Sequence, residues 1–317
     1  MFADGGRTVT FDEETIEFLY ALKPSTRSIY SAGLEAFQAF YAQQGTIKDF
    51  LDRTEQDQQL PRRERKRVAR TTLKGFVEWM KTQTTFKPKT IRTYVGAVQS
   101  LARYLEIDVS TRYTGLPAPN PSSKKYPWTL ESVGKFAALM DKPLYKCLVA
   151  VFFQSGLGVS DVLALTCEDV KTEYEVGTVP LCLDLVRIKT ATPHVTFLGK
   201  LGVELLHNYL LTRGPLDPAD RLFPVSKTAI ERLFVRKSKR LKEDHEGLVR
   251  CGPHTLRTAF RTLIVDAGCP ETYAEFFMGH NLTSDNKKIY ASKTRDGWRA
   301  EYAKYEKAVT YSLEEGK

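Results

Sequence analysis

His254-Thr-Leu-Arg-Thr-Ala-Phe-Arg-Thr-Leu-Ile-Val-Asp-Ala-Gly268 is predicted to form a helix that carries a histidine and an arginine three residues apart on one face. His280 lies twenty-three residues after Arg257, and Tyr290 lies ten residues after His280. A tyrosine hydroxyl is a nucleophile, an arginine fork binds two phosphate oxygens, and histidines donate hydrogen bonds or move protons. This set of side chains suits covalent attack on a phosphodiester.

Three further segments extend the pattern along the chain. Phe276-Phe-Met-Gly-His280 contains a Gly-His pair, and Arg187-Ile-Lys-Thr190 followed by Val195-Thr-Phe-Leu198 has the composition of a β-hairpin that presents a lysine. Ser155-Gly-Leu-Gly-Val-Ser-Asp-Val-Leu-Ala-Leu-Thr-Cys-Glu-Asp-Val170 precedes them. In this order, the four segments resemble the motifs of the tyrosine recombinases, also called phage-type integrases.

The resemblance implies a role for each motif residue. Tyr290 would attack the scissile phosphate and leave a 3′-phosphotyrosyl bond and a free 5′-hydroxyl. Arg257 would clamp that phosphate, and His254 would assist proton transfer or hydrogen-bond the phosphate. His280 would hold a non-bridging oxygen or orient the tyrosine. Lys189 would protonate the departing 5′-oxygen, although hairpin register cannot be read from sequence and other basic residues lie nearby. The chemistry conserves bond energy, so no cofactor or metal is expected.

Gly158 is the one departure from the pattern, because the family normally carries its first catalytic arginine at this position. Loss of one of two arginines is expected to slow phosphoryl transfer by about 10³-fold or more. Three interpretations stay open. The glycine is natural and Arg187 or another basic group substitutes; the chain binds DNA without cutting it; or the glycine was introduced to trap a complex.

Basic residues are concentrated between residues 62 and 92. The whole chain has a net charge of +9, and this segment alone, with eleven Lys or Arg and two Glu, carries the same excess. A surface of this kind suits a polyanion, whereas a solvated helix face is the structural alternative. The residues expected to contact DNA here and elsewhere are Arg27, Arg62, Arg63, Arg65, Lys66, Arg67, Arg70, Lys87, Lys89, Arg92, Lys124 and Lys125.

Hydrophobic periodicity and proline content divide the 317 residues into two domains. Residues 1–109 are predicted to form about four helices, and the resemblance makes them an all-α core-binding (SAM-like) domain. Residues 110–127 contain four prolines and are predicted to be an extended linker, able to span roughly 60 Å. Residues 128–317 would form an α+β catalytic domain. The resemblance implies that the two domains clamp a duplex.

The second domain is predicted to be mainly helical, with a small antiparallel β-sheet formed by residues 176–188 and 195–198. The expected helices are Leu130–Met140, Tyr145–Phe153, Val159–Leu165, Val203–Leu211, Lys227–Leu241, Leu256–Ala267, Glu271–Met278, Ser284–Ala291 and Arg295–Tyr311. From Trp298 to Tyr311 the last helix is amphipathic. In the family such a helix docks on a neighbouring protomer of a tetramer on DNA; the alternative is packing on its own domain.

Five scattered cysteines without a Cys-x-x-Cys pair indicate reduced thiols in an intracellular protein and suggest no metal site. The charged N-terminus predicts neither a signal peptide nor a membrane span, so a cytoplasmic, nucleoid-associated location is expected. The interpretation is therefore a site-specific recombinase that acts on a double-stranded DNA attachment site. The alternatives are a non-cutting DNA-binding protein of the same fold and a type IB topoisomerase-like enzyme.

Overall fold

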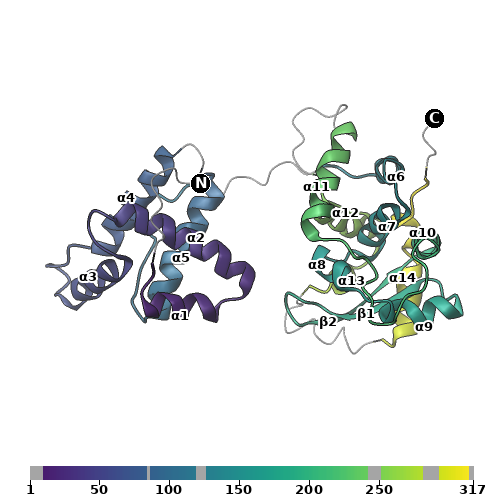
Figure 1. The fold of residues 1–317 in the computed structure, drawn as a ribbon, viewed down its shortest axis with the longest axis horizontal. Coiled ribbons are helices and arrows are strands. Elements are labelled where there is room, and N and C mark those ends of the chain that lie inside the picture. The colour runs from purple at the N-terminus through teal and green to yellow at the C-terminus, as the bar shows by residue number, and fades with distance from the viewer. Residues whose placement is uncertain (1–9, 84–85, 119–125, 242–250, 281–292, 314–317) are drawn as a thin grey trace. The chain divides into compact units, whose positions relative to one another are not determined.

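The computed structural model describes residues 10–83, 86–118, 126–241, 251–280 and 293–313 (Figure 1). The chain divides into two compact units, Met1–Pro121 and Ser122–Lys317. The predicted fold class is confirmed: the protein is mainly helical, and a two-stranded antiparallel sheet is the only sheet among the described residues.

The first unit consists of helices packed around α2. Its described helices are α1 (Glu13–Ala21), α2 (Pro24–Tyr41), α3 (Ile47–Gln59), α4 (Val68–Thr82) and α5 (Pro88–Tyr104). Helix α2 contacts each of the other four. The centre of the core is aromatic, since the ring of Phe37 lies 4.9 Å from that of Phe50 and 5.1 Å from that of Phe76.

Helix α3 is one more helix than the periodicity of this region predicted. Most of its side chains are polar, so its apolar stripe is short. Its start is fixed by a capping box, in which the backbone N–H of Asp49 donates to Oγ1 of Thr46 and that of Thr46 donates to the carboxylate of Asp49. Phe50 and Leu51 then anchor it in the core.

The second unit is built around α7, whose residues from Cys147 to Ser155 are all buried. Helix α7 contacts α6, α8, α10, α12 and the sheet (Figure 1). The described elements of this unit are α6 (Leu130–Ala138), α7 (Pro143–Ser155), α8 (Val159–Ala164), α9 (Glu168–Val176), β1 (Leu181–Val186), β2 (Pro193–Leu198), α10 (Lys200–Leu210), α11 (Lys227–Ser238), α12 (Pro253–Asp266), α13 (Glu271–Phe277), α14 (Arg295–Ala303) and the 3₁₀ turns η1 (Lys239–Leu241) and η3 (Glu306–Val309).

The sheet is a hairpin in which β1 and β2 pair from Leu181 opposite Leu198 to Val186 opposite Pro193. The sequence predicted that strand structure would begin at Val176, but that residue ends helix α9. The helix begins at a side-chain turn in which the backbone N–H of Thr166 donates to the carboxylate of Asp169. The predicted helix Ser284–Ala291 lies outside the described residues.

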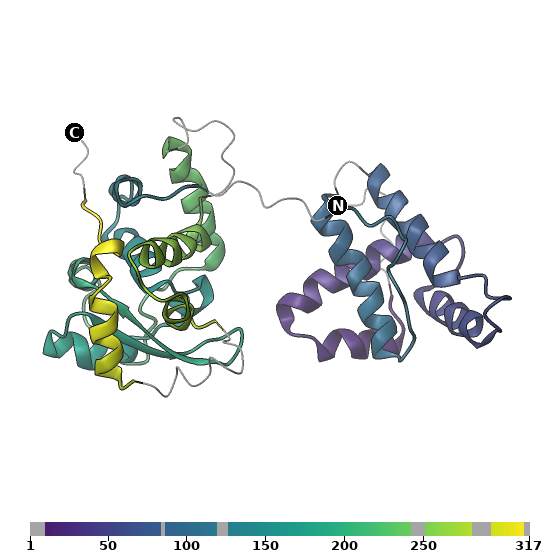
Figure 2. The same cartoon turned by 180° about the vertical axis from the view of Figure 1, so that it is seen from behind.

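The C-terminal helix is shorter than predicted, because α14 ends at Ala303 and a 3₁₀ turn follows (yellow in Figures 1 and 2). Trp298 stacks on Phe276 at 4.2 Å, and the hydroxyl of Tyr302 donates to the carbonyl oxygen of Gln154. Both side chains are buried within the second unit. The apolar face of α14 therefore packs on its own domain within this chain, and docking of the C-terminal segment on a neighbouring protomer stays a prediction.

Candidate active site

Arg257 lies on α12 and is buried, with only 2% of its surface exposed. Its Nη1 donates a hydrogen bond to the carbonyl oxygen of Gly156, and its Nη2 donates one to that of Met278 at 2.7 Å. Burial and the nearby Arg187 lower the pKa of Arg257 to about 10. The guanidinium therefore stays charged at neutral pH, and two of its five N–H donors are fixed by backbone carbonyls.

Two glycines shape the backbone around this guanidinium. Gly156 follows α7 with φ +63°, and a Cβ there would overlap the ring of Phe260. Gly279 follows α13 with φ +65°, and a Cβ there would lie 2.8 Å from Cγ of His194. Both positions therefore need a left-handed residue without a side chain. The Gly-His pair marks the turn that delivers the carbonyl of Met278 to Arg257.

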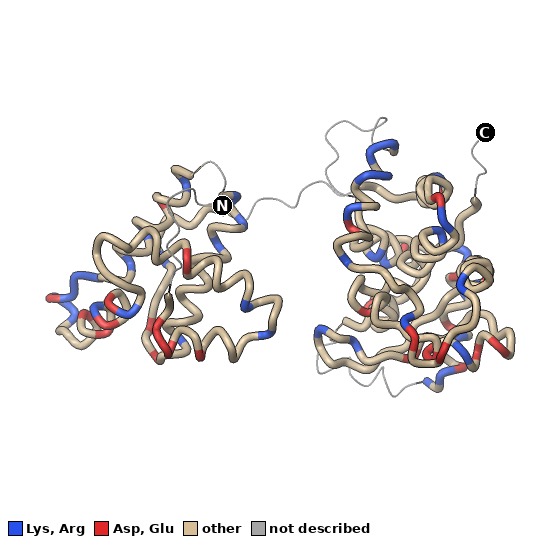
Figure 3. Tube along the Cα trace, viewed as in Figure 1, with Lys and Arg blue, Asp and Glu red and all other residues tan. Residues whose placement is uncertain are grey.

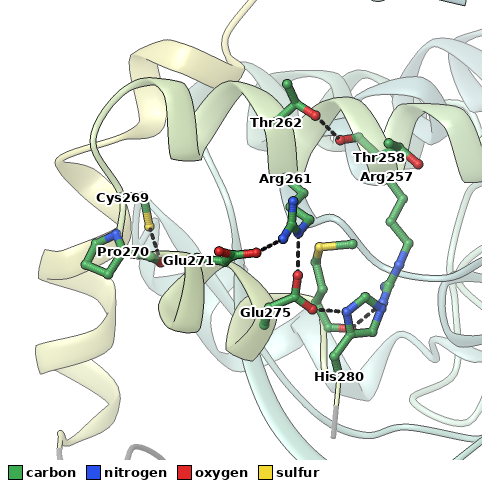
Figure 4. Close-up of polar contacts among 10 residues, drawn as sticks. Arg257, Thr258, Arg261, Thr262, Cys269, Pro270, Glu271, Glu275 and His280 are labelled. Atoms are coloured by element: carbon green, nitrogen blue, oxygen red, sulfur yellow. Dashed lines mark hydrogen bonds and ion pairs between the residues drawn. The ribbon is translucent and has the colours of Figure 1, made fainter. Parts of the chain in front are cut away.

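His280 is half-buried and its ring is held by an acidic neighbour (Figure 4). Its Nδ1 pairs with Oε2 of Glu275, and Oε1 of Glu275 accepts a hydrogen bond from Nε of Arg261. Burial lowers the pKa of His280, the Glu275 contact opposes the shift, and the charge of Arg257 adds to it. Burial works against ionisation of Glu275, but hydrogen bonds from Arg261 and His280 lower its pKa. The result is a neutral imidazole at neutral pH beside an ionised carboxylate.

Gly158 is the N-cap of α8, and the carboxylate of Asp161 occupies the space beside it. A Cβ at residue 158 would lie 2.8 Å from Oδ2 of Asp161. Oδ1 of Asp161 accepts a hydrogen bond from the backbone N–H of Ile188 at 3.0 Å, and Oδ2 lies 3.8 Å from Nε of Arg187. Nη1 of Arg187 donates to the carbonyl oxygen of Gly279 at 2.8 Å. A second guanidinium, carried by the turn after β1, therefore reaches the Gly-His turn.

The remaining motif residues lie at the surface or outside the described part of the chain. Lys189 is exposed in the turn between β1 and β2, and His254 is exposed in the first turn of α12. Tyr290 lies in segment 281–292, outside the described residues. Among the motif residues, the structure brings Arg257 and His280 together at one turn.

The sequence assigned no function to three side chains near this turn, Asp161, His194 and Glu275. A fourth, Arg187, was named only as a possible substitute for the missing first arginine. His194 is buried, and burial lowers its pKa. The sequence contained one signal that His194 is buried, since residues two apart on a strand share a face and His194 therefore lies on the same face of β2 as the buried Thr196. Glu275 precedes His280 by five residues, a spacing that only the end of α13 brings into contact.

In the first unit, the connection between α3 and α4 is rich in basic residues (Figure 3). Its exposed basic residues are Arg62, Arg63, Arg65, Lys66 and Arg67, and Lys87, Lys89 and Arg92 are exposed at the start of α5. Arg70 stacks over the ring of the exposed Tyr113. Lys124 and Lys125 lie outside the described residues. The exposed basic residues between α3 and α4 and at the start of α5 therefore form a positively charged surface that is available to a polyanion.

Arg27 was expected to contact phosphates, but its guanidinium has partners within the protein. It donates to the carbonyl oxygens of Leu19, Tyr20 and Leu22 at the end of α1, at 2.9, 3.0 and 3.3 Å. Its Cζ also lies 4.5 Å from the ring centre of Tyr20. These contacts assign Arg27 to the junction of α1 and α2.

The fold and the arginine-histidine site agree with the comparison to known families. The Phage integrase family matches residues 132–296, which is more than half of the chain. The chain belongs to this family, the tyrosine recombinases.

Among its relatives, Tyrosine recombinase XerC from Syntrophus aciditrophicus is 21% identical over 224 residues, which cover 65% of this chain and 70% of the relative. The XerC of Thermodesulfovibrio yellowstonii is 23% identical over 222 residues, covering 66% of this chain and 65% of that protein. The alignments therefore span about two thirds of each relative.

Two solved structures share the fold. The XerH site-specific recombinase in a post-cleavage complex with palindromic difH substrate has a TM-score of 0.54 at 18% identity, covering 87% of this chain and 78% of that chain. The Tn1549 transposon integrase in complex with transposon right end DNA has a TM-score of 0.53 at 19% identity, covering 86% of this chain and 98% of that chain. At these identities the likeness establishes the fold.

Other features of the chain bear on its chemistry. The five cysteines are free thiols. Within the described ranges, no group of three His, Cys, Asp or Glu side chains is arranged to hold a metal ion, and no helix there is long and apolar enough to span a bilayer.

Proposed function

We propose that this chain is a site-specific DNA recombinase that cleaves and rejoins duplex DNA through a 3′-phosphotyrosyl intermediate. The observation that carries the proposal is the buried, charged guanidinium of Arg257, held by the carbonyls of Gly156 and Met278 beside His280. A guanidinium fixed in this way is preorganised to bind the oxygens of a phosphodiester. Membership of the family, and the DNA named with the XerH and Tn1549 structures, support duplex DNA as the partner.

In the proposed step, the oxygen of Tyr290 attacks the scissile phosphorus while the bond from phosphorus to the 5′-oxygen breaks. The tyrosine loses its proton to a histidine of the site, either His254 or His280, and Lys189 gives a proton to the departing 5′-oxygen. One phosphate ester replaces another, so rejoining by the reverse step needs no external energy source.

The environment of His280 supports a specific part in this step. Because its imidazole is neutral and Nδ1 faces the carboxylate of Glu275, Nδ1 carries the proton and Nε2 is the acceptor nitrogen. An acceptor suits the hydroxyl of Tyr290, whereas a phosphate oxygen needs a donor. Of the two roles expected for His280, the structure therefore favours orientation of the tyrosine.

We assign the first unit to DNA binding. The exposed basic residues between α3 and α4 and at the start of α5 support this assignment, because phosphate contacts of this kind bind duplex without regard to sequence. Exchange of strands between two duplexes needs four attacking tyrosines, so the proposal includes a tetramer on DNA and a four-way junction intermediate.

The test is formation of a covalent adduct on nicked duplexes drawn from DNA that flanks the gene, detected by denaturing electrophoresis. The unaltered chain should form the adduct, Tyr290→Phe should abolish it, and Arg257→Ala should slow it by about 10³-fold. Tyr305→Phe is the matched control, because Tyr305 lies on the C-terminal segment beside α14 and should react normally.

Two results would contradict the proposal. Duplex binding without an adduct would favour a non-cutting DNA-binding protein, and relaxation of supercoiled plasmid without strand exchange would favour a topoisomerase-like enzyme.

A further inference from the structure

We propose that Arg187 is the second phosphate-binding guanidinium of this site and supplies, from the turn after β1, the charge that Gly158 does not supply from α8. The inference rests on the proposed function and names a catalytic residue for it.

The first argument is placement. Arg187 donates to the carbonyl oxygen of Gly279, and Arg257 donates to that of Met278. These carbonyls belong to consecutive residues, whose Cα atoms lie about 3.8 Å apart. Two guanidiniums that start from different elements therefore converge on one turn, as two clamps on one phosphate must.

The second argument is the donor capacity of Arg187. Its side chain is 14% exposed. Within the described part of the chain, its buried Nε has no hydrogen-bond partner, since the carboxylate of Asp161 lies 3.8 Å away. A buried N–H without an acceptor is destabilising unless a ligand provides one. A phosphate oxygen is such an acceptor, and it also suits the positive charge.

The third argument concerns electrostatics. Arg187 contributes, after burial, to the lowered pKa of Arg257, so the two cations act on each other. Both positive charges can be held together stably only when negative charge is near. Asp161 and Glu275 provide negative charge near Arg257. A phosphodiester would provide more at the side where the guanidiniums converge.

The fourth argument links Arg187 to the glycine itself. A Cβ at residue 158 would lie 2.8 Å from the carboxylate oxygen of Asp161 that faces Arg187. The other oxygen of Asp161 is held by the backbone N–H of Ile188 in the same turn. Any side chain at 158 therefore requires this oxygen of Asp161 to shift. The absence of a side chain at Gly158 therefore leaves Asp161 in the position from which it faces Arg187.

The experiment compares the unaltered chain with three variants and a control by single-turnover adduct formation and, separately, by affinity for intact duplex. Arg187→Gln, which keeps a donor for the carbonyl of Gly279, should form the adduct about 10²-fold more slowly or worse, with affinity changed by less than about threefold. Gly158→Arg alone should bring no gain in rate. The double variant Gly158→Arg/Arg187→Gln should recover at least about tenfold over Arg187→Gln, because the arginine then occupies the usual position of the family.

Arg295→Ala is the matched control, since Arg295 is an exposed arginine that pairs with Asp184 on β1, and it should react like the unaltered chain. An adduct formed by Arg187→Gln at the unaltered rate would overturn the inference and leave the proposed function intact. No adduct from the unaltered chain, with adduct from Gly158→Arg, would also overturn it. No adduct from either protein would overturn the proposed function as well. Melting temperatures of all variants distinguish loss of chemistry from loss of fold.

Discussion

Replacement of Gly279 by alanine tests the physical basis of the Gly-His turn without reference to any substrate. Alanine at φ +65° costs about 1–2 kcal/mol, because its Cβ crowds the following carbonyl. Its Cβ would also lie 2.8 Å from the buried ring of His194, and crowding of a packed interior costs about 1–3 kcal/mol more. We therefore expect Gly279→Ala to lower the free energy of unfolding of the second unit by about 2–5 kcal/mol.

Gly177→Ala is the matched control, because Gly177 also ends a helix, has φ +74°, and has open space where its Cβ would point. Gly177→Ala should lower the free energy of unfolding only by the cost of alanine at positive φ, about 1–2 kcal/mol. The assay is urea unfolding followed by tryptophan fluorescence in a Trp79→Phe background, so that the remaining tryptophans, Trp128 and Trp298, report on the second unit. Equal losses in the two alanine variants would refute the contact with His194.

Two further predictions concern the pH dependence of stability and the role of Arg27. Burial lowers the pKa of His194 below its ordinary value of about 6.5, so the contribution of this histidine to stability is present above that pH and is lost as pH falls through the folded-state pKa. The melting temperature should therefore fall between pH 7 and 5, and it should fall less in His194→Phe. An equal fall of the melting temperature with pH in both proteins would contradict this prediction. Arg27→Ala should destabilise the first unit by about 1–3 kcal/mol with little change in duplex affinity, whereas Lys89→Ala should do the opposite in the same melting and gel-shift measurements.

Much of the fold could be predicted from sequence because most helices have an apolar stripe at helical spacing and end near glycine or proline. Helices α3 and α9 could not, since few of their residues are apolar. Both depend on side-chain turns at their starts, Thr46 with Asp49 and Thr166 with Asp169, and on packing against neighbouring elements, which are α2 and α4 for α3 and β1 for α9. From sequence alone, a polar segment of this kind is predicted to be a loop, because its helical structure depends on tertiary contacts.

The sequence predicted Arg257 and His280 as site residues because both lie in linear motifs, and the structure brings the two side chains to one turn. The groups that surround them converge from separate elements. Arg187 and His194 come from the hairpin, where register decides which side chains point inward, and Asp161 comes from α8. Spacing along the chain contains no information about such a convergence, so Arg187 was only one of several candidate substitutes for the missing arginine.

The crowding between residue 158 and Asp161 has an evolutionary consequence. A lineage that exchanges glycine for arginine at 158 while it keeps the arginine at 187 must shift the oxygen of Asp161 that faces Arg187 before it gains a usable charge. Under the proposed role of Arg187, the benefit of an arginine at residue 158 depends on the residue at 187, which is epistasis. The two positions are then expected to change together, with an arginine at one accompanying the loss of the arginine at the other.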